Sequence, residues 1–573
     1  MSTISVPARP KRSFMPEDFS VDHWEGLQGY FEELESREIG SLDDLRRWFK
    51  DRSEIEAILS EDAGWRYINM TRYTDNEEYS SAYQYFVQEI QPKIAPVSDR
   101  LNKKAIGSAY IAELEKETGY DIMIREMRKD IEIFREENIA LNTEIQTLTQ
   151  QYGQISGAMT VEYEGKELTL QQAAVKLQSP DRQLREEIYH LIANRRLQDK
   201  EKLDELYSKL ITLRHKVAQN AGFDNYRDYM FKSMGRFDYT PQDCFDFHES
   251  VKKEVVPMLD DLAVMRKEQL EVDALKPWDK AVDPQNREPL TPFQGGEDLT
   301  DKTIECFRRL DPYLGQCLEI MKTMGHLDLE SRKGKAPGGY NYPLSEIGVP
   351  FIFMNATSTL RDMITILHEG GHAVHSFLTR ELELSDFKHT PSEVAELASM
   401  SMELISMDHW DLFFDNAEDL KRAKQEHLEQ IIETLPWVAT IDKFQHWIYE
   451  NPDHTEEQRH EQWVSIFNAF SDDVTDWSGL EVNKKFLWQK QLHLYEVPFY
   501  YIEYGMAQLG AVAVWKNFKE DPDKGLNGYM NALKLGYTRS IPEVYEAANI
   551  RFDFSKDYIK KLMQFVKEEL ASL

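Results

Sequence analysis

The sequence has few cysteines and no long apolar run. Only three of its 573 residues are cysteine, Cys244, Cys306 and Cys317, and no two of them have the CxxC spacing of a zinc knuckle. An odd, sparse set argues against a disulfide framework and for a reducing compartment, and we interpret all three cysteines as structural. No stretch approaches the roughly 18 uninterrupted apolar residues of a membrane span, so we expect no membrane insertion.

The chain is also poor in basic residues relative to acidic ones. It has 68 Lys and Arg against 101 Asp and Glu, a net charge of −33. Such a surface disfavours nucleic acid and anionic membranes as partners and favours cationic ligands such as peptide amino termini. The amino terminus, MSTISVPARPKRSFMPEDF, has no apolar core after its basic residues and does not resemble a signal peptide. We expect a cytoplasmic, acidic protein; the sequence leaves its oligomeric state open.

Apolar residues at helical spacing predict a protein that is helical almost throughout. The stretch from Ile124 to about Gln151 predicts one long amphipathic helix. MTVEYEGKELTL alternates around Glu164-Gly165 and predicts a small β-hairpin. Helix starts are indicated at Ser179-Pro180 and Thr240-Pro241.

Two stretches interrupt the helical pattern. Residues 276–299 are rich in Pro, Gly and Asp and predict a long loop. Residues 331–355 are irregular, with strand character at GGY and at PFIFMN. We divide the chain into a helical region with the hairpin, residues 1–195, and a second region, residues 196–573, which contains the motifs described next.

The pattern of the segment TILHEGGHAVHSF, residues 365–377, predicts a helix with two glycines in its interior. Each such glycine costs about 1 kcal/mol relative to alanine, so a compensating role is expected. We expect Gly371 to let another helix approach closely and Gly370 to widen the space around the site. His368 and His372 are four residues apart and project from one helical face, where two imidazoles can bind one zinc ion. Glu369 points in an adjacent direction and can act as general base on water, the HExxH arrangement. Chance alone produces this pattern in roughly a few per cent of chains of this size, and histidines of a packed core are the alternative.

A catalytic zinc site needs a third protein ligand and an open position. The metzincin pattern requires a glycine and then a histidine at the two positions where this chain has His375 and Leu378, and therefore fails. In the segment SEVAELASMSMEL, Glu396 and Glu403 lie on one face of a helix whose neighbours are mostly small or apolar. A buried carboxylate needs a partner, and a metal ion is one candidate.

HEGGH followed by AELASMSME, with Glu396 24 positions after His372, resembles the M3 family of zinc oligopeptidases. PFIFMN, YRDY at 226–229 and LKPWD at 275–279 are similar to its oligoendopeptidase F and Pz-peptidase branch. The resemblance covers roughly residues 200–560. It implies that His368, His372 and Glu396 bind one zinc ion per chain, that Glu369 is the base and that Glu403 orients a ligand histidine.

The same resemblance implies hydrogen-bond donors on a late helix that stabilise the tetrahedral intermediate. HLYEVPFYYIEYGMAQLGA supplies His493, Tyr501 and Tyr504, with Tyr500 as a substitute for one of the tyrosines. From the residues alone, such a cluster is more often packing. The histidine-to-tyrosine spacing is one residue shorter than in thimet-type members, and the family usually has a bulkier residue in place of Gly370.

The resemblance implies a mainly α fold whose two lobes enclose a deep channel, with a few short strands near the site. Strands near Gly338, Gly339 and residues 350–354 are expected to hold the substrate backbone by edge pairing. The expected activity is zinc-dependent endopeptidase cleavage of oligopeptides. The alternatives are a carboxypeptidase or dipeptidase, which needs a cation from the set Arg332, Lys333, Lys335 and Arg539, and a catalytically dead helical scaffold. Cobalt or manganese remain possible substitutes for zinc.

Overall fold

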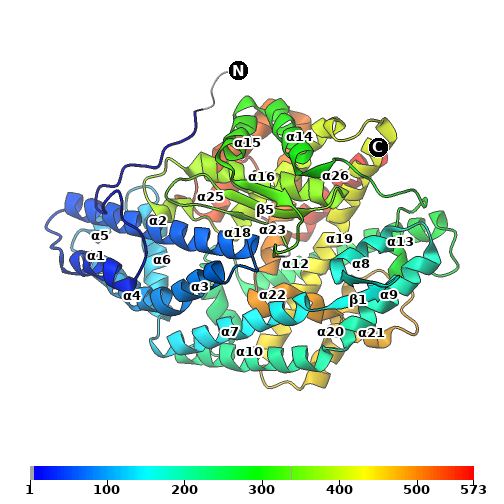
Figure 1. The fold of residues 1–573 in the computed structure, drawn as a ribbon, viewed down its shortest axis with the longest axis horizontal. Coiled ribbons are helices and arrows are strands. Elements are labelled where there is room, and N and C mark those ends of the chain that lie inside the picture. Colours follow the sequence, from blue (N-terminus) through cyan, green and yellow to red (C-terminus); the bar gives the residue numbers. More distant parts are fainter. Residues whose placement is uncertain (1–4, 337) are drawn as a thin grey trace. The chain divides into compact units, whose positions relative to one another are not determined.

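A computed structural model describes residues 5–336 and 338–573 and confirms a mainly α-helical protein (Figure 1). The chain forms two compact units, each built from segments that are distant in sequence. The first unit comprises residues 1–136, 291–420 and 510–552, and the second comprises 137–290, 421–509 and 553–573. The predicted boundary at residue 195 stays a prediction.

The first unit contains three groups of elements. Its amino-terminal helices are α1 (Trp24–Ser36), α2 (Leu42–Arg72), α3 (Glu77–Tyr85), the π-helix Phe86–Ile90, α4 (Gln91–Ile106), α5 (Ile111–Leu114) and α6 (Tyr120–Ile133). Its middle segment holds α14 (Gly295–Leu310), α15 (Pro312–Met324), β3 (Leu327–Glu330), β4 (Tyr340–Tyr342), β5 (Phe351–Ala356), α16 (Leu360–Thr379), α17 (Ser385–Lys388), α18 (Ser392–Ile405) and the 3₁₀ helix Ser406–Leu412. Its last segment adds α24 (Pro522–Leu533) and α25 (Ile541–Ala547).

The second unit begins with α7 (Glu137–Gly157), β1 (Thr160–Tyr163), β2 (Lys166–Thr169), α8 (Leu170–Val175), the 3₁₀ helix Lys176–Gln178, α9 (Arg182–Leu197) and α10 (Lys200–Asn220). It continues with α11 (Tyr226–Ser233), α12 (Pro241–Glu254), α13 (Val256–Gln269) and the 3₁₀ helix Pro277–Asp279. The later elements are α20 (Glu456–Phe470), α21 (Glu481–Lys485), the 3₁₀ helix Leu487–Lys490, α22 (Leu492–Glu496) and α26 (Lys556–Ser572). Two long helices, α19 (Ala417–Glu450) and α23 (Tyr501–Glu520), each contain one of the points at which the chain passes from one unit to the other.

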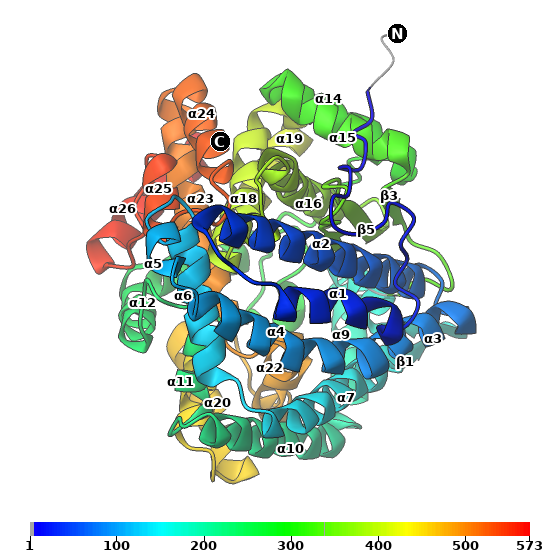
Figure 2. The ribbon, with the colours of Figure 1, turned by 90° about the vertical axis from the view of Figure 1, so that its left-hand side faces the viewer.

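The three-stranded sheet of the first unit has the order β3-β5-β4. β5 is therefore the central strand, parallel to β3 and antiparallel to β4. Phe351 and Phe353 of β5 pack with Ile68 of α2 and Leu344 in a small buried cluster. Figures 1 and 2 show β5 and α16 as neighbours, so the sheet supports the helix that carries the HEGGH segment.

The hairpin predicted around Glu164-Gly165 is confirmed. β1 and β2 pair antiparallel, with Tyr163 opposite Lys166. Glu164 and Gly165 both have positive φ, 50° and 73°. Two positive φ values are what a two-residue type I′ turn requires, because that turn matches the twist of the strands.

The single long helix predicted from Ile124 to Gln151 is wrong. The chain forms α6 and α7 instead, and Phe134 takes an extended conformation after α6 ends. The interruption, residues 134–136, lies just before Asn138, the second residue of α7. This asparagine is buried and donates a hydrogen bond to the Val217 carbonyl of α10, 3.0 Å away. The break lets α7 pack along α10 in the second unit, as both ribbon views show (Figures 1 and 2).

Two other boundaries differ by a few residues. The helix start at Thr240-Pro241 is confirmed. The start expected at Ser179-Pro180 lies later, because the carboxylate of Asp181 accepts from the backbone NH groups of Gln183 and Leu184 and caps α9. The loop expected over 276–299 ends at Gln294, and α14 begins at Gly295. Within the described residues, no helix is both long and apolar enough to span a membrane.

Candidate metal centre and active site

Helix α16 is positioned by its first turn. The Thr359 hydroxyl accepts a hydrogen bond from the Asp362 backbone NH at 3.2 Å, and the Asp362 carboxylate accepts from the Thr359 NH at 3.0 Å. This reciprocal cap satisfies two donors that a helix end leaves unpaired. The apolar side of the helix, including Leu367 and Val374, is fully buried. His368 and His372 lie on the other side, with side chains 21% and 20% exposed.

Gly371 provides the close approach that the sequence predicts. A Cβ at this position would lie 2.7 Å from the Ala398 carbonyl oxygen and 2.7 Å from the Ser399 Cα, both in α18. Real Cβ atoms do not approach backbone atoms so closely, so any side chain here would push α18 away. The glycine therefore brings the helix of Glu396 directly against the helix of the two histidines.

Gly370 has a different role from the predicted one. A Cβ there would lie 2.6 Å from the ring of Phe307 in α14. The ring of Phe307 thus occupies the volume that a side chain at position 370 would need, so the glycine does not leave open space around the site. The expectation that Gly370 widens the site is wrong, because the core of the unit fills that volume.

Three donor atoms converge on one point between α16 and α18. A carboxylate oxygen of Glu396, Oε2, lies 3.3 Å from Nε2 of His368 and 3.7 Å from Nε2 of His372. The two imidazole rings are nearly perpendicular, at 85°, with centroids 4.9 Å apart. Ser399 donates a hydrogen bond to the same Glu396 oxygen at 3.0 Å and so fixes the carboxylate.

This donor set fits a zinc ion. Ligand bonds of about 2.0–2.2 Å at tetrahedral angles separate neighbouring donors by roughly 3.4 Å, close to the two measured separations. Burial, with the nearby His368 acting in the same direction and Glu396 against it, lowers the pKa of His372 to about 4, so this imidazole is neutral and able to ligate at neutral pH. Burial also disfavours the charged form of His368, but hydrogen bonds to Glu396 and Glu403 outweigh it and raise the pKa of His368 well above its usual value. In the metal-free protein, the proton on His368 thus balances the negative charge of Glu396 and Glu403. A divalent cation bound to the donor atoms can replace this proton.

Glu403 contacts the ring nitrogen of His368 that faces away from Glu396. Its Oε1 lies 2.6 Å from Nδ1 of His368, which leaves Nε2 directed at Glu396. A carboxylate at the far nitrogen sets the tautomer and orientation of a metal-binding histidine.

Replacing Glu403 with glutamine is expected to weaken zinc binding by about 10–100-fold, because the amide holds the imidazole less strongly. Competition against a chromophoric chelator measures this affinity. Glu381→Gln makes the same charge change at an exposed position and should leave affinity unchanged. Equal affinities for the two variants would contradict the orienting role.

Glu369 lies beside the donor atoms without being one of them. Its side chain is buried, and burial raises its pKa to about 7 in the metal-free protein, with the nearby Glu396 acting in the same direction and His368 against it. Asn341 of β4 donates to the Glu369 backbone carbonyl at 3.2 Å and ties the sheet to this turn of α16. A carboxylate with a pKa near neutrality is suited to exchange protons with water.

His375 is separate from the donor set. It is buried, and burial lowers its pKa to about 3. The group of donors that converge includes His368, His372 and Glu396 only. His375 is therefore a buried residue outside this donor set.

The strands near the site correct one prediction about substrate binding. The strand expected at PFIFMN is confirmed as β5, whereas the strand expected at GGY lies later, as β4 from Tyr340 to Tyr342. β5 is paired on both sides, so the expectation that residues 350–354 bind a peptide by edge pairing is wrong. β4 is at the sheet edge and follows Gly338 and Gly339, whose role in binding substrate stays a prediction.

The late aromatic residues form one cluster in the second unit. The ring of His493 in α22 lies 4.9 Å from that of Tyr501 and 6.1 Å from that of Tyr500, between centroids. The Tyr504 hydroxyl is 3.5 Å from His493 Nε2. The structure therefore brings all four predicted residues together, and helix α23 begins at Tyr501.

Residues that the sequence did not suggest support this cluster. Gln491 contacts His493 Nδ1 through its amide nitrogen at 2.8 Å and accepts from the Trp437 indole at 3.2 Å. Phe499, directly before the tyrosines, has a positive φ of 69°, an uncommon conformation for a bulky residue. Two contacts hold it: Gln445 accepts from its NH at 2.6 Å, and Arg236 donates to its carbonyl. No local motif distinguishes these supporting residues.

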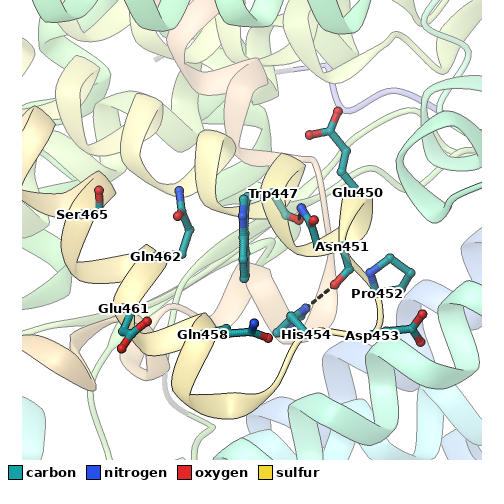
Figure 3. A pocket seen from close by; sticks show the side chains of 10 residues that line it. All are labelled: Trp447, Glu450, Asn451, Pro452, Asp453, His454, Gln458, Glu461, Gln462 and Ser465. Carbon is teal, nitrogen blue, oxygen red and sulfur yellow. Dashed lines mark hydrogen bonds between the residues drawn. The ribbon is translucent and has the colours of Figure 1, made fainter.

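A large pocket lies elsewhere in the second unit, where α19 ends and α20 begins (Figure 3). Its volume is about 690 Å³. It is lined by Trp447, Glu450, Asn451, Pro452, Asp453, His454, Gln458, Glu461, Gln462 and Ser465. None of these is a predicted metal or catalytic residue, and His454 is occupied by a hydrogen-bond contact with the Asn451 carbonyl at 2.6 Å.

Known proteins resemble this chain in both sequence and fold. An oligoendopeptidase F homologue of Lactococcus lactis is 22% identical over 380 residues, which cover 65% of this chain and 61% of that protein. The match thus spans less than two thirds of this relative. Two solved structures are more extensive matches: a Pz peptidase A with an inhibitor, with a TM-score of 0.91, and a protein described as putative oligoendopeptidase F, with a TM-score of 0.90. Each is 26% identical and covers 98% of this chain and 99% of its own.

Two family models match along the chain. The model of the peptidase M3 N-terminal domain matches residues 14–134. The model of peptidase family M3 matches residues 175–299 and 319–564, more than half of the chain. These segments include α16, α18 and the aromatic cluster of the second unit. The chain belongs to peptidase family M3.

Proposed function

We propose that this protein is a zinc-dependent endopeptidase that hydrolyses internal bonds of short oligopeptides in the cytoplasm. The observation that carries the proposal is the convergence of His368, His372 and Glu396 on one point, with the buried carboxylate of Glu369 beside it. Family membership and the names of the relatives support the peptidase activity. The net charge of −33 favours substrates with cationic groups over anionic ones.

The metal would be held by the two histidines and Glu396. When bound, zinc supplies Lewis-acid chemistry, which acidifies water and polarises a carbonyl group. Glu369 takes the proton of the attacking water on its carboxylate and then gives it to the nitrogen of the leaving amine, so its charge is restored after each turnover. Glu403 and Ser399 keep His368 and Glu396 in place during this exchange.

We assign stabilisation of the tetrahedral oxyanion to His493, Tyr501 and Tyr504, with Tyr500 as an adjacent substrate contact. A phenol remains protonated at neutral pH and is a suitable donor to an oxyanion. The contact between Gln491 and His493 Nδ1 sets the ring so that Nε2 faces Tyr504.

Tyr504→Phe is expected to lower kcat by about 10²–10³ with little change in KM, because the lost donor acts on charge that develops in the transition state. Steady-state kinetics on a quenched peptide separates the two constants. Tyr110→Phe removes a hydroxyl that bonds the Gly40 carbonyl in the first unit and serves as the control. A raised KM at constant kcat would instead make Tyr504 a ground-state binding residue.

The exopeptidase alternative needs an available cation for the substrate's terminal carboxylate. Two of the four candidates are engaged by Asp328, which accepts from Arg332 at 2.6 Å and from Lys335 at 2.9 Å. The side chain of Lys335 is also completely buried. These contacts favour the endopeptidase over the carboxypeptidase.

The deciding experiment is hydrolysis of an internally quenched peptide of about ten residues, blocked at both ends, with and without a chelator. Cleavage that the chelator abolishes and zinc restores supports the endopeptidase. If the protein cleaves this peptide only when its ends are free, it is an exopeptidase instead. A protein that binds zinc and cleaves neither peptide would be a scaffold.

A further inference from the structure

A second group of metal-binding side chains lies in the core of the second unit, on α12 and α19. Cys244, Asp442 and His446 each offer one donor atom, and the three atoms lie within 4.8 Å of one another. All three residues are buried, with exposures of 0%, 0% and 1%. A thiol, a carboxylate and an imidazole are together the donor types that zinc selects.

Two short spacings bring these residues together. Cys244 and His248 are four residues apart on α12, and Asp442 and His446 are four apart on α19. Each pair therefore shares one helical face. His248 Nε2 lies 2.8 Å from Asp442 Oδ2 and joins the two helices.

Hydrogen bonding within the described residues leaves three atoms of His446 and Asp442 unsatisfied. Among these residues, neither ring nitrogen of His446 has a hydrogen-bond partner, and its Nε2 lies 3.3 Å from Asp442 Oδ2 without the alignment of a hydrogen bond. In the same described part of the chain, Asp442 Oδ1 also lacks a hydrogen-bond partner. Buried polar atoms are nearly always paired, because leaving them unpaired forfeits their interaction with water. A simple His–Asp–His network thus leaves several atoms unexplained.

The surroundings of His446 are aromatic. Phe245 and Phe499 lie 4.8 and 5.4 Å from the His446 ring, between centroids, and Phe231 lies 5.9 Å away. The His248–Asp442 contact resembles the outer hydrogen bonds that orient metal-bound carboxylates. An apolar shell around such a donor set strengthens the attraction between a cation and its anionic ligands.

We propose that Cys244, Asp442 and His446 form a second, structural zinc site, with His248 orienting Asp442. Binding releases the thiol proton of Cys244 to solvent, and the thiolate and carboxylate neutralise the divalent ion. Cys244 is then a ligand rather than only a packing residue, and the expected zinc content rises from one to two ions per chain.

Contacts near this site indicate which segment a bound ion would stabilise. His446 contacts Phe499, and the adjacent Gln445 accepts from the Phe499 backbone. Phe499 is the residue with positive φ directly before Tyr500 and Tyr501. An ion that links α12 to α19 would therefore stabilise the base of the segment that carries the tyrosines.

The test uses the full-length His368→Ala/His372→Ala protein, which lacks the first site, so it is independent of the proposed catalysis. After loading with Co²⁺ and removal of excess metal, we expect one bound equivalent and a near-ultraviolet thiolate-to-cobalt absorption. Adding Cys244→Ala should abolish both signals. Adding Cys306→Ala, at a buried cysteine of the first unit, should preserve both.

Absence of bound cobalt and of the thiolate absorption from the folded double variant would overturn the proposal. Bound cobalt without that absorption would do the same, because the ion would then lie at another site. If the protein with Cys244→Ala added fails to fold, the thiolate absorption of the His368→Ala/His372→Ala protein, and its retention when Cys306→Ala is added, still test the proposal.

Discussion

Glu369→Gln is expected to lower kcat for peptide hydrolysis by about 10²–10⁴, the usual contribution of a general base. The amide has nearly the shape of the carboxylate but cannot take a proton from water. Since Glu369 is not among the three converging donors, zinc content should remain that of the wild type. Kinetics on an end-blocked quenched peptide, together with metal analysis of the same samples, measures both quantities.

The comparison with a ligand variant makes this result specific. His372→Ala should lose activity and zinc together, whereas Glu369→Gln should lose activity alone. If Glu369→Gln also lost its zinc, the residue would support the metal rather than exchange protons. Near-normal kcat in a zinc-loaded Glu369→Gln protein would remove the general-base assignment.

The pH dependence follows from the ionisation of the same residue. The base must be deprotonated, so kcat/KM should fall as the pH falls through its pKa. Burial raises that pKa to about 7 in the metal-free protein, and a bound cation lowers it because an opposite charge favours the carboxylate. The acid limb of the wild-type profile is therefore expected below pH 7. A rate that is flat from neutral to acidic pH would contradict this assignment.

Gly371→Leu is expected to destabilise the first unit by at least about 3 kcal/mol, beyond the usual cost of overpacking. The added Cβ alone would meet the α18 backbone at 2.7 Å, and backbone atoms cannot move aside as a flexible side chain can. Displacing α18 also displaces Glu396, so zinc binding should weaken with stability. Thermal unfolding and zinc content report the two effects.

Gly29→Leu is the matched control for this substitution. Gly29 lies inside α1 of the same unit, and a Cβ there meets no atom within 4 Å. Leucine should stabilise that helix by about 0.5–1 kcal/mol, because it has the higher helix propensity. Equal melting temperatures for the Gly371→Leu protein and the wild type would show that the close approach of α16 and α18 does not constrain the fold.

Local features of the site could be read from the sequence, because they depend on the pitch of one helix. The spacing of His368 and His372 places both imidazoles on one face wherever the helix lies. The cap at Thr359 and the turn at Glu164-Gly165 are equally local. The strong helical pattern also predicted the mainly α fold correctly.

Contacts between distant segments could not be read in the same way. The apolar pattern before and after Asn138 suggested one helix, but the bond from this residue to Val217 belongs to the packing of α7 on α10. Gly370 was assigned to open space because nothing in the sequence places Phe307 against it. Whether β5 is an edge or a central strand is decided by strand order, which local pattern does not contain.

The sequence by itself determined the helical face with two histidines, the adjacent carboxylate and the candidate third donor. Only the tertiary structure decided that Glu396 meets the histidines, through the absence of a side chain at Gly371. It likewise brought Cys244 to within reach of Asp442 and His446, nearly 200 residues later. The physical reason is the same in both cases: backbone periodicity is local, whereas a metal site needs donors whose distances are set by how helices pack.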